Sequence, residues 1–128
     1  MYVRELMSPY VIHVAPGDSL AAAREKLRMN RIHHLIVLDG KRIVGVISYR
    51  DLIGKADGLT VAEVMSRDVV TVVPTDSVRS AASRLLGRTH GCAAVLEAGE
   101  ITGVLTTTDL LRAVTSHAPA TPLEAKLI

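Results

Sequence analysis

The sequence predicts a mixed α/β (α+β) fold built from two copies of one small unit. The chain aligns with itself without a gap when it is shifted by 58 positions, and 18 of the 51 aligned positions from Val3 to Ile53 are identical. Both copies also show the same alternation of short apolar runs and amphipathic segments. Such a repeat indicates one structural unit used twice. We therefore expect a pseudo-symmetric pair, with units at residues 1–58 and 59–115 and a C-terminal tail at 116–128.

The first copy is expected to run helix, strand, helix, strand, strand, helix. The second helix should begin at a cap on Asp18 or Ser19 and present Arg24, Glu25, Lys26 and Arg28 to solvent. Asp39-Gly40 is a strong hairpin signal between two apolar runs. The expected ranges are a short helix at 3–7, strands at 11–14, 35–38 and 43–47, the second helix to about 30, and a last helix opened by Ser48 and ended by Gly54.

The second copy repeats this order. Thr60 and Glu63 have the spacing of a capping box. Of the tail, we expect a loose stretch as far as Leu123 and a segment at 123–128 that could dock, at a place the sequence does not indicate. The expected elements are strands at 69–73, 93–96 and 101–105, a helix from 77 to about 88, and a last helix from 106 to 114 or 115.

The composition and charge of the chain indicate what kind of core it has and which classes of partner are not expected. Of the 128 residues 48% are hydrophobic, with no Phe or Trp, so the core should be aliphatic. The net charge of +2 gives no reason to expect nucleic-acid binding. No apolar run approaches the length of a membrane span and no signal peptide is evident, so a cytoplasmic location is expected. The single Cys92 excludes an intramolecular disulfide framework and reads as a small buried residue.

Two matching stretches, Gly45–Asp51 and Gly103–Asp109, carry the candidate chemistry. Each reads as the end of a strand, then a hydroxyl residue, then a carboxylate three positions on. We call Ser48–Asp51 the first junction and Thr106–Asp109 the second. A carboxylate can accept hydrogen bonds from both hydroxyls of a ribose, and a hydroxyl residue at a helix start, with Arg50 nearby, suits a phosphate.

A purely structural interpretation of the junctions competes with this one. Ser-x-x-Asp and Thr-x-x-Asp also have the spacing of a helix cap, and an acidic residue suits the first turn of a helix. For either junction alone the cap is the favoured interpretation. The two roles are compatible, because a capping carboxylate keeps lone pairs for a ligand.

Together these repeated motifs resemble a pair of CBS domains, the Bateman module, over about residues 1–115. The resemblance implies that the units pack through their small sheets around a pseudo-twofold axis, leaving two clefts. In the family these clefts take adenosine-containing ligands: AMP, ADP, ATP, S-adenosylmethionine or NAD(H). The resemblance also assigns roles. Asp51 and Asp109 would bind ribose, Ser48, Arg50, Thr106 and Thr108 would accompany them, and backbone groups of Ile12, His13 and Val14 or Val70, Thr71 and Val72 would read the adenine edge.

The family's phosphate-binding basic pair falls on His33-His34 in the first copy and on Gly91-Cys92 in the second. The sites are therefore expected to be unequal, with His33, His34, Arg50 and Asp51 forming the better phosphate site. Paired histidines would strengthen phosphate binding on acidification. The alternative is a strand start with one ring on the surface and one packed, and a metal site is disfavoured for lack of partners.

No catalytic motif is present, so an enzyme is not expected. We interpret the chain as a stand-alone CBS-pair regulatory module that requires no cofactor, binds an adenosine ligand with or without magnesium, and signals to an unknown effector protein. The family further implies a homodimer, and we expect no nucleic-acid or membrane partner. The alternative is a dimerisation or docking module without a ligand, which Asp51→Ala would distinguish.

Overall fold

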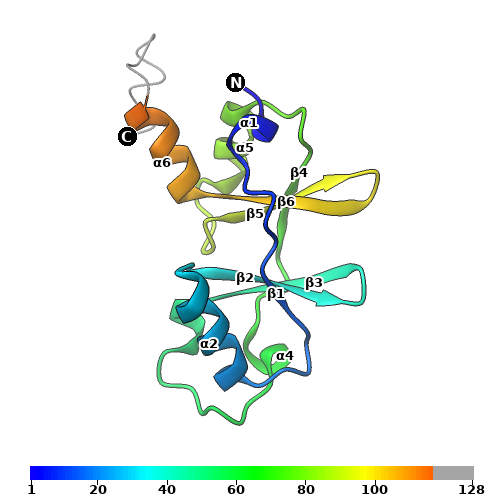
Figure 1. Ribbon diagram of the computed structural model, residues 1–128, viewed down its shortest axis with the longest axis vertical. Coiled ribbons are helices and arrows are strands. Elements are labelled where there is room, and N and C mark those ends of the chain that lie inside the picture. Colours follow the sequence, from blue (N-terminus) through cyan, green and yellow to red (C-terminus); the bar gives the residue numbers. More distant parts are fainter. Residues whose placement is uncertain (117–128) are drawn as a thin grey trace. The chain divides into compact units, whose positions relative to one another are not determined.

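The computed structural model describes residues 1–116, and within that range the mixed α/β fold is confirmed, with two three-stranded sheets and six helices (Figure 1). Of the expected tail at 116–128, Ser116 is the last residue of the final helix, and the rest, including the docking segment at 123–128, lies outside the described residues. None of the helices in the described range is both long enough and apolar enough to cross a membrane.

The two copies have the same order of elements, as the repeat predicts. The first contains α1 (Val3–Leu6), β1 (His13–Val14), α2 (Leu20–Asn30), β2 (His34–Asp39), β3 (Arg42–Ser48) and α3 (Tyr49–Leu52). The second contains α4 (Val61–Val64), β4 (Val70–Val72), α5 (Val78–Leu85), β5 (Cys92–Glu97), β6 (Glu100–Thr106) and α6 (Thr107–Ser116).

Local chemistry explains where the long helices begin. The hydroxyl of Ser19 accepts a hydrogen bond from the Ala22 N–H at 3.1 Å and caps α2. The hydroxyl of Ser77 does the same for α5, from the Ser80 N–H at 3.0 Å. Such caps satisfy backbone donors that the first helical turn leaves without partners.

Several predicted ends needed correction. Strand β1 covers only two residues of the predicted 11–14. Helix α5 ends at Leu85 rather than near Arg88, because Gly87 has a φ of +78°, which a continuing helix cannot accommodate. Helix α3 ends at Leu52, two residues before Gly54, which has a φ of +73°.

Each sheet has its three strands in chain order, β1-β2-β3 and β4-β5-β6. The first pair is parallel and the second antiparallel in both sheets. Even an irregularity in register recurs, between Val37 and Leu38 in β2 and between Val95 and Leu96 in β5. The sequence repeat is thus reproduced in the backbone pairing.

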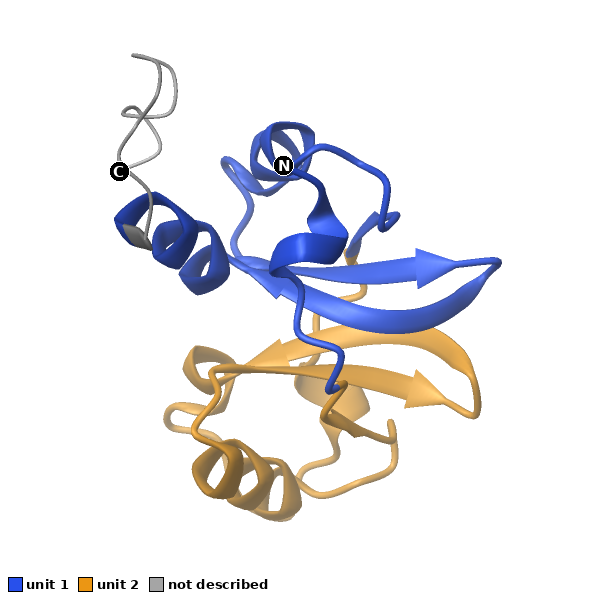
Figure 2. Ribbon diagram, turned by 45° about the horizontal axis from the view of Figure 1, so that its top comes forward, with its two compact units in different colours: residues 1–10, 70–128 blue, residues 11–69 orange. Residues whose placement is uncertain are grey.

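The chain forms two compact units whose limits differ from those of the sequence repeat (Figure 2). One, the first-sheet unit, consists of residues 11–69. The other, the second-sheet unit, combines residues 1–10 with the chain from residue 70 onward. The predicted division at 1–58 and 59–115 follows the repeat, whereas in space each unit takes its short leading helix from the other copy.

Backbone hydrogen bonds hold these exchanged helices. In the first-sheet unit the Val61 N–H of α4 donates to the Asp18 carbonyl at 2.8 Å. In the second-sheet unit the Val3 N–H of α1 donates to the Asp76 carbonyl at 2.9 Å. Both valines are fully buried, so each exchanged helix also contributes a side chain to the core it joins.

Each unit has its own aliphatic core, as the composition predicts. The first-sheet core contains Val14, Leu20, Ala23, Leu27, Leu35, Val37, Ile47, Leu52 and Val61. The second-sheet core contains Val3, Val70, Val72, Val78, Ala81, Leu85, Ala93, Val95, Leu105 and Leu110.

The glycine that opens each repeated motif allows two backbone segments to approach closely. Val46 and Ser66 exchange two backbone hydrogen bonds of 2.9 Å, and a Cβ on Gly45 would stand 2.7 Å from the Ser66 carbonyl oxygen. Gly103 has the same relation to Ser8, with a Cβ that would lie 2.7 Å from its carbonyl oxygen. These glycines therefore have a packing role.

Candidate ligand-binding junctions

Strand register gathers the predicted site residues of the first copy at one end of one sheet. Strand β3 runs antiparallel to β1 and β2, so it ends where they begin. His13 is paired with Ile36, and His34 is paired with Ser48, the last residue of β3. This end of the first-sheet unit therefore carries Ile12, His13, His33, His34, Ser48, Arg50 and Asp51.

The second sheet gathers the corresponding residues in the same way. Val70 pairs with Ala93 and Thr71 with Ala94, while Cys92 at the start of β5 pairs with Thr106 at the end of β6. Val70, Thr71, Thr106, Thr108 and Asp109 thus belong to one end of the second-sheet unit. The structure places the residues, and their roles toward a ligand stay predictions.

Both junctions form the helix cap that was the alternative interpretation. At the first junction the Ser48 N–H donates to Asp51 Oδ2 at 2.8 Å, and the Asp51 N–H donates to Ser48 Oγ at 3.4 Å. At the second junction the Thr106 N–H donates to Asp109 Oδ2 at 2.9 Å, and the Asp109 N–H donates to Thr106 Oγ1 at 3.3 Å. The capping role of both carboxylates is therefore confirmed.

A capping hydrogen bond does not use every acceptor site of a carboxylate. The Thr106 hydroxyl also donates to Asp109 Oδ2, at 3.1 Å, so the bonds from Thr106 meet on one oxygen atom. An ionised carboxylate has about four lone-pair sites on its two oxygens. Asp51 and Asp109 are both half-buried rather than enclosed. A cap of this kind is compatible with accepting further hydrogen bonds from a ligand.

The histidine pair lies at the start of β2. His33 is exposed, His34 is half-buried, and the His33 carbonyl accepts a hydrogen bond from the Tyr49 N–H at 2.9 Å. In the second copy the Gly91 carbonyl accepts from the Thr107 N–H at the same distance. A Cβ on Gly91 would overlap the Thr107 hydroxyl oxygen, so no side chain fits there without displacing Thr107. The two junctions therefore differ in shape as well as in charge.

Cys92 is a buried structural residue, as predicted. Its side chain lies among the core residues of β5 and is 3% exposed. Burial, together with a smaller contribution from the nearby Asp109 carboxylate, raises the pKa of the Cys92 thiol to about 12. A neutral, buried thiol is a poor nucleophile, and it gives the second junction no charge for a phosphate.

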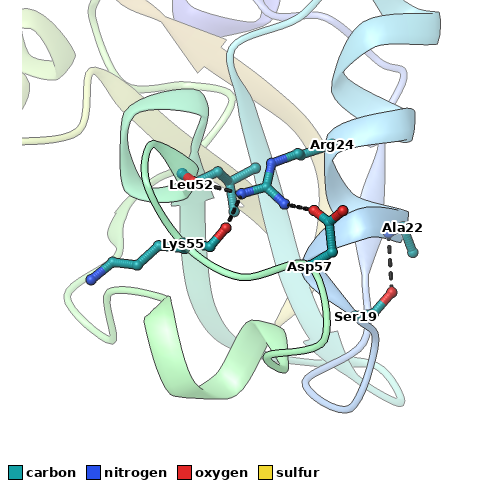
Figure 3. A network of polar contacts seen from close by, with 6 residues as sticks. All are labelled: Ser19, Ala22, Arg24, Leu52, Lys55 and Asp57. Atoms are coloured by element: carbon teal, nitrogen blue, oxygen red, sulfur yellow. Dashed lines mark hydrogen bonds and ion pairs between the residues drawn. The ribbon is translucent and has the colours of Figure 1, made fainter.

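Arg24 has a role that the sequence did not reveal. It was expected on the solvent side of α2, but its guanidinium donates to the carbonyls of Leu52 and Lys55, both at 2.7 Å, and pairs with Asp57 (Figure 3). Leu52 is the last residue of α3, the helix that carries Asp51. Arg24 therefore joins α2 to the end of the first junction helix. The acceptors are mostly backbone carbonyls, which no side-chain pattern reports.

Metal binding finds no support in the described part of the chain. Among residues 1–116, no three His, Cys, Asp or Glu side chains are grouped as metal ligands would be. For the histidine pair, two interpretations stay open: a phosphate contact, and the start of a strand with His33 on the surface and His34 half-buried.

The comparison with known protein families bears directly on these paired junctions. The CBS domain matches the chain twice, at residues 3–58 and 61–116. The chain belongs to the CBS-domain family. Its two matched segments coincide with the two copies of the repeat, so the protein is a tandem CBS pair.

Two curated relatives contain a segment similar to this CBS pair. One is an inosine-5'-monophosphate dehydrogenase of Korarchaeum cryptofilum, 33% identical over 103 residues that cover 78% of this chain and 21% of the relative. The other is an A-adding tRNA nucleotidyltransferase of Geobacter sulfurreducens, 30% identical over 113 residues, which cover 84% of this chain and 13% of the relative. The chain thus spans about a fifth of the first relative and about an eighth of the second.

Solved structures share the fold of this CBS pair. A CBS-domain-containing protein of Agrobacterium tumefaciens has a TM-score of 0.80 at 21% identity, with 88% of this chain and 92% of that chain covered. A Methanocaldococcus jannaschii protein proposed as an archaeal homologue of γ-AMPK has a TM-score of 0.78 at 23% identity, with 88% and 47% covered. At these identities the likeness concerns the fold alone.

Proposed function

We propose that this CBS pair is a regulatory module that binds an adenosine-containing ligand at its junctions and passes the bound state to an effector protein. It performs no catalysis of its own. The candidate ligands are AMP, ADP, ATP, S-adenosylmethionine and NAD(H). Ligand binding would favour one arrangement of the module over another, and the effector would respond to that shift.

The observation that carries this proposal is the repeated grouping of two kinds of chemistry at one end of each sheet. A half-buried carboxylate, Asp51 or Asp109, stands at the start of a helix. An edge strand with an exposed residue, His13 or Thr71, belongs to the same end. A ribose with a base attached needs both kinds of group.

The relatives give this proposal a second line of support. One curated relative is named as an enzyme of a nucleoside monophosphate, inosine-5'-monophosphate, and the segment similar to this CBS pair makes up about a fifth of that enzyme. We extend only the nucleotide-binding role to this chain.

We propose that the two junctions bind phosphate unequally. The first junction has His33, His34 and Arg50 beside Asp51, whereas the second has Gly91, Cys92 and Thr108 beside Asp109. A basic group near a phosphate adds a charge-assisted hydrogen bond, which is about twice as strong as a neutral one. A phosphorylated ligand should therefore occupy the first junction at lower concentration.

A thermal-shift panel tests the proposal: AMP, ADP, ATP, S-adenosylmethionine, NADH and GTP, each with and without magnesium. A ligand that binds only the folded state adds about 2.7 kcal/mol at a hundredfold excess over its Kd. We expect at least one adenosine ligand to raise the Tm, GTP to raise it less, and Asp51→Ala to reduce the shift of a phosphorylated ligand more than Asp109→Ala.

The same panel can refute the proposal. If no adenosine ligand raises the Tm of well-folded, ligand-free protein, the sensor function is wrong and the docking module takes its place. Affinity capture of an effector would then be the next experiment, together with the mass of the assembly in solution, because we also propose a homodimer.

A further inference from the structure

One contact outside the described junctions occurs in both copies at equivalent positions. The Lys26 ammonium on α2 donates a hydrogen bond to the His13 carbonyl at 2.7 Å. The Arg84 guanidinium on α5 donates to the Thr71 carbonyl at 2.8 Å. Lys26 and Arg84 are related by the 58-residue shift, as are His13 and Thr71. The side chains differ in each pair, yet the contact between a cation and a backbone carbonyl is retained.

These carbonyls belong to strands with a partner on one side only. β1 and β4 are the edge strands of their sheets. The Ile12 carbonyl is directed into the sheet, where it accepts from the Ile36 N–H at 3.4 Å, whereas the next carbonyl, that of His13, is taken by Lys26. His13, Thr71, Lys26 and Arg84 are all exposed. The paired cation and carbonyl are thus accessible from outside each unit.

This hydrogen bond does not use all the hydrogen-bonding capacity of the carbonyl or of the cation. A carbonyl oxygen has two lone pairs, an ammonium has three N–H donors, and a guanidinium has five. One bond between them leaves an acceptor and several cationic donors side by side. The edge of adenine presents the reverse arrangement, an amino donor beside a ring nitrogen acceptor. The two edges are therefore complementary.

We propose that Lys26 and Arg84 are base-positioning residues, each fixing the outward carbonyl of an edge strand and offering a donor beside it to an adenine. This inference rests on the proposed function, since it places the base of the same ligand whose ribose meets Asp51 or Asp109. A purely structural tie is the competing explanation, because a cation on an edge strand also protects it from pairing with other chains.

The test separates the base from the rest of the nucleotide. Binding of AMP and of ribose 5-phosphate is measured by calorimetry for wild type, Lys26→Met, Arg84→Met and the double variant. Lys41→Met and Arg79→Met are matched controls, each removing one charge from an exposed position elsewhere in the same unit. Lys26→Arg tests rescue, because it restores a cationic donor.

We expect the double variant to bind AMP about tenfold to a hundredfold more weakly, the loss typical of a hydrogen bond to a charged group. Binding of ribose 5-phosphate should stay within about twofold of wild type, and Lys26→Arg should bind AMP about as well as wild type. The control variants should bind both probes about as well as wild type, apart from a small general effect of charge.

Three outcomes would overturn the inference, and they differ in what else they imply. Unchanged AMP binding in the double variant would leave the sensor function standing and reduce the contact to a structural tie. Equal losses for AMP and ribose 5-phosphate would mean that the variants disturb the whole site. Absence of AMP binding in wild type, after a panel in which no adenosine ligand binds, would overturn the proposed function as well.

Discussion

Asp109 accepts two hydrogen bonds from Thr106 on one oxygen atom, Oδ2, from the backbone N–H at 2.9 Å and from the hydroxyl at 3.1 Å. One residue therefore closes the cap of α6 and keeps its second carboxylate oxygen for other use. Because the cap uses one oxygen of the carboxylate and the proposed ligand contact can use the other, substitutions of Asp109 can separate the stability of the fold from ligand binding.

Asp109→Ala should lower the free energy of unfolding by about 1 kcal/mol, because the Thr106 N–H loses its acceptor. Asp109→Asn should lower it less, since an amide oxygen can still accept that bond. Both should weaken AMP binding at the second junction. Urea denaturation and calorimetry measure the two effects, and an Asn variant that binds AMP as wild type does would show that the ribose role is wrong.

Gly45→Ala should destabilise the protein by about 1–3 kcal/mol, the usual range for overpacking a filled site. A Cβ at this position meets a backbone oxygen at 2.7 Å, and backbone cannot move aside as a side chain can. Gly58→Ala is the control, because nothing lies within 4 Å of a Cβ there. Comparable losses in the two variants, measured by urea denaturation, would contradict the packing role of Gly45.

Arg24→Ala should lower stability by about 1–2 kcal/mol, because the carbonyls of Leu52 and Lys55 lose a charged donor. Arg28→Ala on the same helix should change stability much less, since its pair with Glu25 is exposed to solvent. The midpoint of urea unfolding compares them. If the two variants unfold at the same denaturant concentration, the tie between α2 and α3 does not hold the unit together.

Stability should fall as pH rises from about 9 to about 12, in part because of Cys92. Its folded-state pKa of about 12 lies above the ordinary thiol pKa of 9.0. In that window the unfolded chain loses the thiol proton while the folded protein keeps it, so stability decreases by up to about 1.4 kcal/mol per pH unit from this group. Below pH 9 the contribution is fully retained.

Cys92→Ala isolates the contribution of this thiol. The unfolding free energy of wild type, relative to that of the variant, should fall steadily between pH 9 and 12. A constant difference across that range would mean that the thiol titrates as it does in water. Slow alkylation of Cys92 by iodoacetamide at pH 8 is a second check.

Local features of the fold could be predicted from the sequence, whereas long-range ones could not. The starts of α2 and α5 could be predicted at Ser19 and Ser77, because a helix cap depends only on residues about three positions away. The exchange of α1 and α4 between the units could not be predicted in this way. The Val61 N–H donates to the backbone carbonyl of Asp18, and every residue has such a carbonyl. Gly87 was a visible signal for the end of α5, and the predicted helix ran past it.

In the candidate site, too, local patterns could be predicted and long-range contacts could not. The junction residues were found because a hydroxyl and a carboxylate recur at a fixed spacing. Lys26 and Arg84 were overlooked as surface charges, although a shared signal existed: both positions are basic and related by the 58-residue shift. Their acceptors are main-chain carbonyls, so the pairing became visible only in three dimensions.

The exchanged leading helices also set the order in which this protein can fold during synthesis. Residues 11–69 hold all parts of one unit and can close as soon as they have left the ribosome, in keeping with folding from the N-terminal side. Residues 1–10 emerge earlier but must wait for a sheet made from residues 70 onward. Residues 1–10 are therefore buried later than residues 11–69, which follow them in the sequence, and Val3 stays exposed until the second sheet has been made.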